Sequence, residues 1–408
     1  MSDSAAVGEE SEVQVRVLQT LTELDAVARS WHALWDRCRG VRTPALSFEW
    51  VRIWARCFAA DGRLHIIIVE KNDAAIGIIP LVRNRYRIWP FALEAFETAA
   101  PESRNLIALV APGDGPIVAR AAARHLAHCA ISTRRALWLS LIPSEHPFLS
   151  QLADALRSAT THIALQVRSC NCAPYAPLPA VWHDFERSIG KSRRKILARS
   201  QRRLDLSRAE VSITERHGDE VPDAMSRLFR SHNARWAEAG VRGLFTDERV
   251  RAFHTAIAAE CDRLGWLDMT EMQIDGVTAS IQFVPVLDGV AYLMRSGRDT
   301  TFAEYDVGHL HDLHLFRKWV NAGLREVDFL RGVEPYKFYW TRRYRVYVDV
   351  LAVRPWVRGS VALWIVRRWL RVSRFLQHRH PPRELLYYLR LRRGIRGELR
   401  QMKVDLRQ

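Results

Sequence analysis

Residues 267–296 read LDMTEMQIDGVTASIQFVPVLDGVAYLMRS, and this stretch decides the fold of the second half of the chain. Two Asp-Gly pairs, at 275–276 and 288–289, separate three runs rich in apolar residues. An Asp-Gly pair between such runs is the strongest short-range signal for a β-hairpin, because both residues tolerate the positive φ of a tight turn. The stretch therefore predicts three consecutive strands. They cover 267–274, 277–286 and 290–296.

Helical patterns surround the three strands. The helix expected over 191–204 is strongly basic, with seven Lys and Arg between Lys191 and Arg203. After the strands, a helix is expected from Val307 to Asn321, and a buried strand follows from Arg325 to Leu330. Helices that alternate with strands in this way predict a mixed α/β domain. The helices expected before the strands cover 182–189, 191–204, 221–239 and 249–264.

The first half of the chain repeats this organisation. Trp50, Trp54 and Phe58 recur at i, i+4 and i+8 and predict a helix over 48–58. A Pro-rich segment, 170–179, reads as a connection to the second half. The remaining elements expected here are helices over 21–38, 121–129 and 148–159 and strands over 64–70, 75–82, 136–141 and 163–168.

Composition and charge divide the chain into three parts. We expect an N-terminal domain over 13–179, a C-terminal domain over 180–355 and a basic tail over 356–408. From Arg354 on, 14 Arg and one Lys stand against three acidic residues, so residues 354–408 carry +12 of the chain's +16 and the body is only mildly basic. The tail predicts basic amphipathic helices. They would either dock on an anionic membrane surface or a partner, or pack on the body with a solvated arginine face.

The overall composition limits the class of protein. With 48% hydrophobic residues among 408, the chain is neither disordered nor of low complexity. Its six scattered cysteines do not form a disulfide framework and favour a reducing compartment. The sequence shows no signal-peptide pattern and no apolar run near the roughly 20 residues that span a bilayer. We therefore expect a cytoplasmic protein, with peripheral contact at the inner membrane through the tail.

The start of the helix expected at Val307 has the properties of an anion site. A strand delivers the chain into a helix N-terminus, where Val307, Gly308, His309 and Leu310 would present free backbone N–H groups. These groups and the positive end of the helix dipole attract a pyrophosphate. The sequence therefore predicts a phosphate-binding site here.

No metal site is expected. On a helix, His311 and His314 share a face, but His309 lies well round from His311. Cys170 and Cys172 are too closely spaced for a zinc knuckle, and no second pair accompanies them.

Three quoted stretches carry a resemblance to a known family. They are DGVTASIQFVPVLDGVAYLMRSGRD (275–299), YDVGHLHDLHLFRKWVNAG (305–323) and, above all, DFLRGVEPYKFYW (328–340). Together they resemble the second domain of the two-domain GNAT-type acyltransferases grouped with the cellulose-biosynthesis protein CelD, distant relatives of the Fem peptidyltransferases. The basic helix GKSRRKILARSQRRL (190–204) also matches, and similarity of lower specificity extends over about 30–350. The resemblance implies an α/β fold of two tandem GNAT-like domains with mixed sheets flanked by helices.

The resemblance also implies an activity. It is the transfer of an acyl group, most simply acetyl from acetyl-CoA as co-substrate, to an amine or hydroxyl of a polysaccharide or cell-envelope precursor. Lys337 would lie near the developing oxyanion or a phosphate, and Tyr336 or Tyr339 would protonate the departing thiolate. The cofactor site would consist of the helix start at 307–310 together with Arg331.

Two carboxylates complete the expected site. Asp328 and Glu334 would bind the acceptor or take its proton, and Arg331 would pair with either. A purely structural interpretation is also open. Asp328 would then cap a turn after the strand, and Glu334 would form an i, i+3 pair with Lys337.

Two other functions remain open. The first is a Fem-like transfer from aminoacyl-tRNA, which the basic helix at 191–204 favours and which is the only reading with a nucleic-acid partner. The second is a non-catalytic GNAT scaffold that docks on a membrane synthase through 356–408. In all other readings the partner is a small-molecule or glycan-precursor acceptor.

Overall fold

The computed structural model describes residues 13–354, apart from 60–61, 89–90, 100–107, 133–134, 161–162, 239, 241 and 333. The basic tail and its expected helices lie outside the described residues. The chain divides into two compact units. Unit 1 holds the described residues up to Arg168 and those from Asp349 on, and the described part of unit 2 is Ser169–Val348. Within the described part of the chain, no helix has the length and apolarity needed to cross a bilayer.

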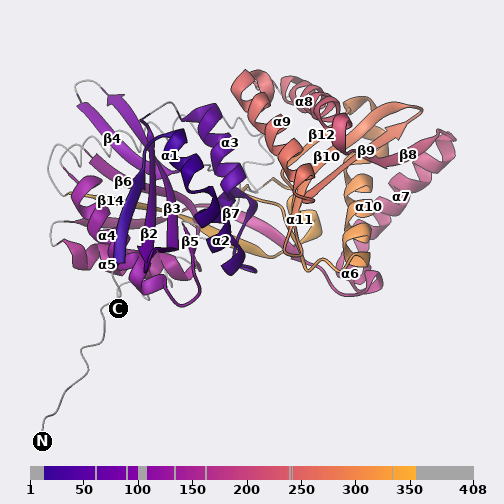
Figure 1. The fold of residues 1–408 in the computed structure, drawn as a ribbon. Helices are drawn as coiled ribbons and strands as arrows, with labels where there is room; N and C mark the ends of the chain where they lie inside the picture. The colour runs from indigo at the N-terminus through magenta and orange to yellow at the C-terminus, as the bar shows by residue number, and fades with distance from the viewer. Residues whose placement is uncertain are drawn as a thin grey trace, which may run out of the picture. The chain divides into compact units, whose positions relative to one another are not determined.

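Unit 1 is a mixed sheet with helices (Figure 1). Strands β1, β2, β3 and β4 pair antiparallel in chain order, and β4 then runs parallel to β6. The strands are β1 (Val13–Leu18), β2 (Leu64–Lys71), β3 (Ala74–Ile88), β4 (Phe91–Thr98), β5 (Leu109–Val110) and β6 (Arg135–Pro143). The helices are α1 (Leu21–Ala26), α2 (Ala28–Arg37), α3 (Phe48–Phe58), α4 (Gly115–Cys129) and α5 (Pro147–Ala159), with a 3-10 turn at Pro44–Leu46.

The helices of unit 1 bury the faces that their sequences predicted. Trp50 and Trp54 of α3 are buried, and Ser47 caps this helix by accepting a hydrogen bond from the Trp50 amide at 3.2 Å. In the neighbouring α2, the Trp31 indole N–H donates to the Leu46 carbonyl at 3.0 Å. The amphipathic pattern therefore fixes which side of each helix packs inward.

Unit 2 contains the three strands that the two Asp-Gly turns separate. Its strand order is β7-β13-β11-β10-β9-β8, and β12 pairs with β10. The strands are β7 (Ala164–Pro177), β8 (Val211–Glu215), β9 (Leu267–Ile274), β10 (Val277–Leu287), β11 (Val290–Tyr292), β12 (Arg295–Arg298), β13 (Glu326–Asp328) and β14 (Tyr344–Val353), of which β7 and β14 also have residues in unit 1. The helices are α6 (Trp182–Ser188), α7 (Lys191–Ser207), α8 (Val221–Glu238), α9 (Glu248–Arg263), α10 (Val307–Asn321) and α11 (Lys337–Trp340). Short 3-10 segments occur at Gly218–Glu220, Leu244–Thr246 and Thr300–Tyr305.

Helices cover both faces of the β9–β10 sheet, because adjacent residues of β9 contact different helices (Figure 1). Glu271 accepts hydrogen bonds from Arg227 of α8, whereas the Thr270 hydroxyl lies 2.9 Å from the His311 imidazole of α10. Side chains alternate along a strand, so α8 and α10 lie on opposite faces. The core around α10 is strongly apolar and includes Phe316 and Trp319.

The hairpin prediction is confirmed at both turns. Asp275 and Gly276 have φ of 49° and 76°, and Asp288 and Gly289 have φ of 47° and 73°. Two consecutive positive φ values are those of the type I′ turn that Asp-Gly favours. The helix expected from Val307 to Asn321 is confirmed with the same bounds.

Three sequence predictions need correction. The helix expected over 21–38 is two helices, α1 and α2, because Val27 between them leaves the helical conformation at a ψ of 8°. The third strand, expected over 290–296, is interrupted after Tyr292 and resumes as β12. The Pro-rich segment over 170–179, expected as a connection, is largely strand, since β7 continues to Pro177. Proline lacks only the amide N–H, and the Pro174 carbonyl still accepts from the Phe329 amide at 3.0 Å.

Candidate functional site

The interruption of the third strand opens the sheet of unit 2. β11 runs parallel to β13 in the register Val290–Glu326 to Tyr292–Asp328, and the Leu293 amide still donates to the Asp328 carbonyl at 2.9 Å. The next amide, that of Met294, donates instead to Phe283 of β10 at 3.2 Å. From this point β12 follows β10, and among the described strands it pairs with β10 alone.

The chain beyond β13 is hydrogen-bonded to β7 and not to β12. The amides of Phe329 and Gly332 donate to carbonyls of β7, at 3.0 and 2.9 Å. Leu330 between them has φ of +56°, an unfavourable conformation for a side chain of this size, and the Asp328 carboxylate stabilises the turn by accepting from the Leu330 amide at 2.8 Å. β12 and residues 329–332 thus separate, and the outer edge of β12 faces the opening.

The N-terminus of α10 carries two unpaired amides. Asp306, in the left-handed region at φ 54°, accepts through its carbonyl from the amides of His309 at 2.9 Å and Leu310 at 3.2 Å. Among the described residues, the amides of Val307 and Gly308 have no hydrogen-bond partner. Of the four positions predicted to bind phosphate, Val307 and Gly308 therefore have free N–H groups, and His309 and Leu310 do not.

Arg298 of β12 connects this helix end with the opening. A side-chain carbon added at Gly308 would lie 3.6 Å from Arg298 Cδ, an ordinary contact distance. The exposed guanidinium of Arg298 is thus next to the two free amides. Together they form a positive group at the end of β12.

Asp306 and His309 form a hydrogen-bonded pair that the sequence analysis did not identify. The Asp306 Oδ1 and His309 Nδ1 atoms are 2.6 Å apart, so the imidazole Nδ1–H donates to the carboxylate. His309 Nε2 is buried and has no partner among the described residues, which leaves it able to accept a proton. The ring packs edge-on against Tyr339, with 5.2 Å between centroids. The i, i+3 spacing of Asp306 and His309 was visible in the sequence, but it is too common to indicate a pair.

Asp312, one turn further along α10, is a buried carboxyl whose hydrogen bonds join three elements of unit 2. It accepts from Gln282 Nε2 of β10 at 2.7 Å and from the Trp340 indole of α11 at 3.1 Å. Burial raises its pKa, while the charges of His309 and Arg298 act in the opposite direction. Asp312 therefore joins β10, α10 and α11 around one buried group.

Tyr336 stands directly before α11 and is surrounded by charges. Burial raises the pKa of its phenol, and the carboxylates of Glu334 and Asp312 raise it further. The charges of Arg235 and Arg298 act against this shift, and the phenol stays protonated at neutral pH.

Lys337 is buried, and its ammonium group contacts oxygen atoms of residues 330–334, just before it in the chain. Its Nζ donates to the Arg331 carbonyl at 2.7 Å and to the Leu330 carbonyl at 3.5 Å, and it lies 2.9 Å from Glu334 Oε2. Only 4% of Lys337 is exposed. The ammonium group therefore donates to two carbonyls and forms an ion pair with Glu334, all within residues 330–334.

The two other predicted residues, Asp328 and Arg331, differ in burial. Asp328 is fully buried, and its second carboxylate oxygen is 3.7 Å from Arg345 Nη1 of β14. The Arg331 side chain is exposed. The structure thus brings Tyr336, Lys337 and Glu334 together, with Asp328 at the strand end that precedes them.

The basic helix α7 has one buried arginine and an exposed basic stripe. Arg193 is 8% exposed, and its guanidinium carbon lies 3.0 Å from the centroid of the Tyr339 ring. The exposed stripe has the spacing i, i+4, i+8 and i+11 of a single helix face. It consists of Lys191, Lys195, Arg199 and Arg202.

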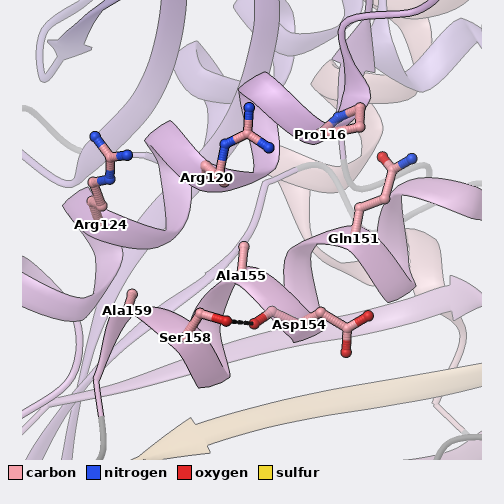
Figure 2. Close-up of a pocket in the computed structure, with 8 residues that line it drawn as sticks. All are labelled: Pro116, Arg120, Arg124, Gln151, Asp154, Ala155, Ser158 and Ala159. Atoms are coloured by element: carbon pink, nitrogen blue, oxygen red, sulfur yellow. Dashed lines mark hydrogen bonds between the residues drawn. The ribbon is translucent and has the colours of Figure 1, made fainter.

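A groove of about 420 Å³ lies between α4 and α5 of unit 1 (Figure 2). Arg120 and Arg124 of α4 and Gln151 and Asp154 of α5 line it, and the Ser158 hydroxyl donates to the Asp154 carbonyl. These side chains offer no nucleophile with an adjacent base. The groove belongs to unit 1, whereas every predicted site residue belongs to unit 2.

Comparisons with known proteins identify the kind of domain. Residues 191–338 match the family model described as an acetyltransferase (GNAT) domain. No curated protein matches the chain. The matched residues make up most of unit 2.

Three solved structures share the fold. FemX has a TM-score of 0.55 at 9% identity, over 82% of this chain and 96% of its own. A conserved protein of unknown function from Bacteroides thetaiotaomicron VPI-5482 has a TM-score of 0.52 at 11% identity, over 83% and 99%. The C-terminal domain of a putative lysylphosphatidylglycerol synthetase from Agrobacterium fabrum has a TM-score of 0.50 at 13% identity, over 83% and 95%. The predicted α/β fold of the GNAT type, with mixed sheets flanked by helices, is confirmed.

Proposed function

We propose that unit 2 transfers an acyl group, acetyl in the simplest case, from a coenzyme A thioester to an amine or hydroxyl of a polysaccharide or cell-envelope precursor. The single observation that carries this proposal is the opening beside β12, which leads to the free amides of Val307 and Gly308. The acceptor class rests on the resemblance of residues 328–340 to the CelD-like proteins and on nothing in the site itself.

The opening fits an acyl-CoA in two respects. Two unpaired amides, a helix dipole and Arg298 suit a pyrophosphate. The free edge of β12 offers backbone groups to the amides of a pantetheine arm, as a sheet edge does to an added strand. The Asp306 carboxylate at the same helix end works against an anion, but it is already hydrogen-bonded to His309.

The groups near the opening suit acyl transfer. When bound, the thioester supplies an activated carbonyl. His309 Nε2 would take the proton of the acceptor, with Asp306 holding the Nδ1–H and the ring orientation. Tyr336 would donate a hydrogen bond to charge that develops on the carbonyl oxygen or on the departing sulfur. Lys337 would position residues 330–334 rather than touch the substrate, because its ammonium group is fully engaged.

Calorimetric titration of the full chain with acetyl-CoA tests the donor. Gly308→Asp adds a carboxylate that stabilises a helix N-terminus by about 0.3–1 kcal/mol, so folding should persist while the pyrophosphate is repelled. We expect saturable binding to the wild type and at least about tenfold weaker binding to Gly308→Asp. Gly190→Asp makes the same charge change at the start of α7, where no neighbour lies within 4 Å, and should bind normally. A folded wild type that binds no acetyl-CoA would sink the proposal.

Acyl-transfer rates test the chemistry. With amino sugars as acceptors, His309→Gln should slow thiol release by about 10²–10⁴-fold at unchanged acetyl-CoA affinity. His314→Gln, on the same helix but exposed, is the matched control. Comparing Tyr336→Phe with Tyr339→Phe decides between the two tyrosines. Only the first should slow the reaction, since Tyr339 is 48% exposed and stacked on Arg193.

A second candidate function is transfer from an aminoacyl-tRNA, which the exposed stripe of α7 favours. Four cations on one face match the spacing needed to follow a phosphate backbone. Under this reading, the affinity for tRNA falls as the salt concentration rises. The double variant Lys195→Gln with Arg199→Gln should reduce the slope of log K against log salt by about 0.7–0.9 for each lost phosphate contact. Acyl transfer that survives RNase and needs only acetyl-CoA excludes it.

A further inference from the structure

Three metal-ligand side chains meet in unit 1, where the sequence analysis expected no metal. His65 lies on β2, and His125 and Cys129 lie on α4. Their potential ligand atoms all lie within 4.8 Å of one another. Among the described residues, no other group of three His, Cys, Asp or Glu side chains meets this closely. His65 is 60 residues from His125 in the chain, so no sequence motif announces the cluster.

The separations suit tetrahedral coordination. His65 Nε2 is 3.1 Å from His125 Nε2 and 3.7 Å from Cys129 Sγ. With Zn–N bonds of about 2.05 Å and a Zn–S bond of about 2.3 Å, tetrahedral Zn²⁺ separates two nitrogens by about 3.3 Å and a nitrogen from a sulfur by about 3.6 Å. The third separation, between His125 and Cys129, is within 4.8 Å, so side-chain movement of about an ångström would bring the three atoms to bonding distance.

The helix and the sheet hold the ligands in place. His125 and Cys129 are four residues apart on α4, so both point from the same helix face. His65 is 5% exposed and packs edge-on against Phe96, with 4.8 Å between ring centroids. His125 and Cys129 are only partly buried, which leaves a path for an ion from solvent and room for a water as fourth ligand.

The protonation states are compatible with a metal. Burial and the neighbouring His125 lower the pKa of His65 to about 4, so its ring is neutral near pH 7 and has a free nitrogen lone pair. Burial raises the pKa of the Cys129 thiol to about 11, and Arg135 and Arg83 act in the opposite direction. A bound dication displaces such a thiol proton.

We propose that His65, His125 and Cys129 bind one Zn²⁺ ion that links α4 to β2. Imidazole and thiolate are the ligands that Zn²⁺ takes in proteins, and the mixed set excludes Mg²⁺ and Ca²⁺, which require oxygen. The ion would join two elements of unit 1, whereas the residues of the proposed acyl transfer belong to unit 2, so this proposal stands apart from the proposed function.

Zinc titration of the chelator-treated full chain, against a chromophoric chelator, tests the site. We expect one equivalent with a Kd below about 1 μM. Cys129→Ser and His125→Gln should each weaken zinc binding by more than about 100-fold. Loss of a residue that only supports a ligand weakens metal binding by about 10–100-fold. Cys57→Ser, a partly buried cysteine on α3, and His128→Gln, an exposed histidine on α4, should bind as the wild type does.

Two further readouts separate this site from adventitious binding. Co²⁺ in place of Zn²⁺ should give a thiolate charge-transfer band that Cys129→Ser lacks and Cys57→Ser keeps. Zn²⁺ at 100 times its Kd should raise the Tm of unit 1 by about 5–10 °C, and the metal-free Cys129→Ser protein should melt near the metal-free wild type. Absence of one-equivalent binding, or binding unchanged in Cys129→Ser, would overturn the proposal and leave His65 and His125 as a hydrogen-bonded pair.

Discussion

Glu271 of β9 is a fully buried carboxylate whose removal tests how α8 is held on the sheet. Its Oε1 accepts from Arg227 Nε at 2.8 Å, and its Oε2 accepts from Arg227 Nη2 at 2.9 Å and from Arg216 Nε at 2.8 Å. The Thr278 hydroxyl donates to it as well. Replacing Glu271 with Gln keeps the shape but removes the charge and half of the acceptors.

The magnitude follows from the burial of the partners. Stranding a buried charge by deleting its partner costs about 3–5 kcal/mol. Here the Arg216 and Arg227 side chains are 17% and 29% exposed, so water partly replaces the lost carboxylate. We therefore expect Glu271→Gln to lower the free energy of unfolding by about 2–4 kcal/mol. At about 2–4 °C per kcal/mol for a unit of this size, the Tm falls by about 4–16 °C.

Urea denaturation followed by circular dichroism and by tryptophan fluorescence measures this effect. Glu304→Gln is the control, because this carboxylate is exposed and the change should stay within about 0.5 kcal/mol. A loss below about 1 kcal/mol for Glu271→Gln would refute the reasoning, since it would mean that the network contributes no more than a surface ion pair.

Three more predictions concern the same unit. Burial alone would raise the pKa of Glu271, but the hydrogen bonds from Arg227, Thr278 and Arg216 hold it below the ordinary 4.5. Its stabilisation is therefore complete above pH 4.5 and lost as the pH falls through the lower folded pKa, so acid unfolding should be less steep in Glu271→Gln. Gly297→Ala should cost about 1–3 kcal/mol in urea denaturation, because its Cβ would lie 3.0 Å from the Leu228 carbonyl, whereas Gly308→Ala meets only ordinary contacts. Lys337→Met should cost about 1–3 kcal/mol by leaving the Arg331 carbonyl and Glu334 without the ammonium group, and equal stability to the wild type would contradict the positioning role.

Much of the local structure was predictable from the sequence, because its causes are local. Asp-Gly at 275–276 and 288–289 set two turns, since these residues adopt the positive φ that the turns require. The bounds of α10 followed from its apolar period and from Gly323, which takes φ of 73° just beyond the helix end. The GNAT-like α/β class followed from the order of these elements and from the resemblance at 328–340.

The site depended on contacts that no local pattern specifies. The break between β11 and β12 arises because Leu293 bonds to β13 and Met294 to β10, two strands from different parts of the chain. Lys337 was predicted to lie near the developing oxyanion or a phosphate, but the sequence does not show that two carbonyls and a carboxylate surround it.

What the sequence determined by itself was most of the helices and the two Asp-Gly hairpins, because side-chain period and turn conformation are properties of neighbouring residues. What only the tertiary structure decided was which polar groups meet. The cluster of His65, His125 and Cys129 and the Asp312 contacts with Gln282 and Trp340 depend on distances of a few ångströms between elements. Such distances are fixed by the packing of the whole unit, in which each element's position depends on all the others.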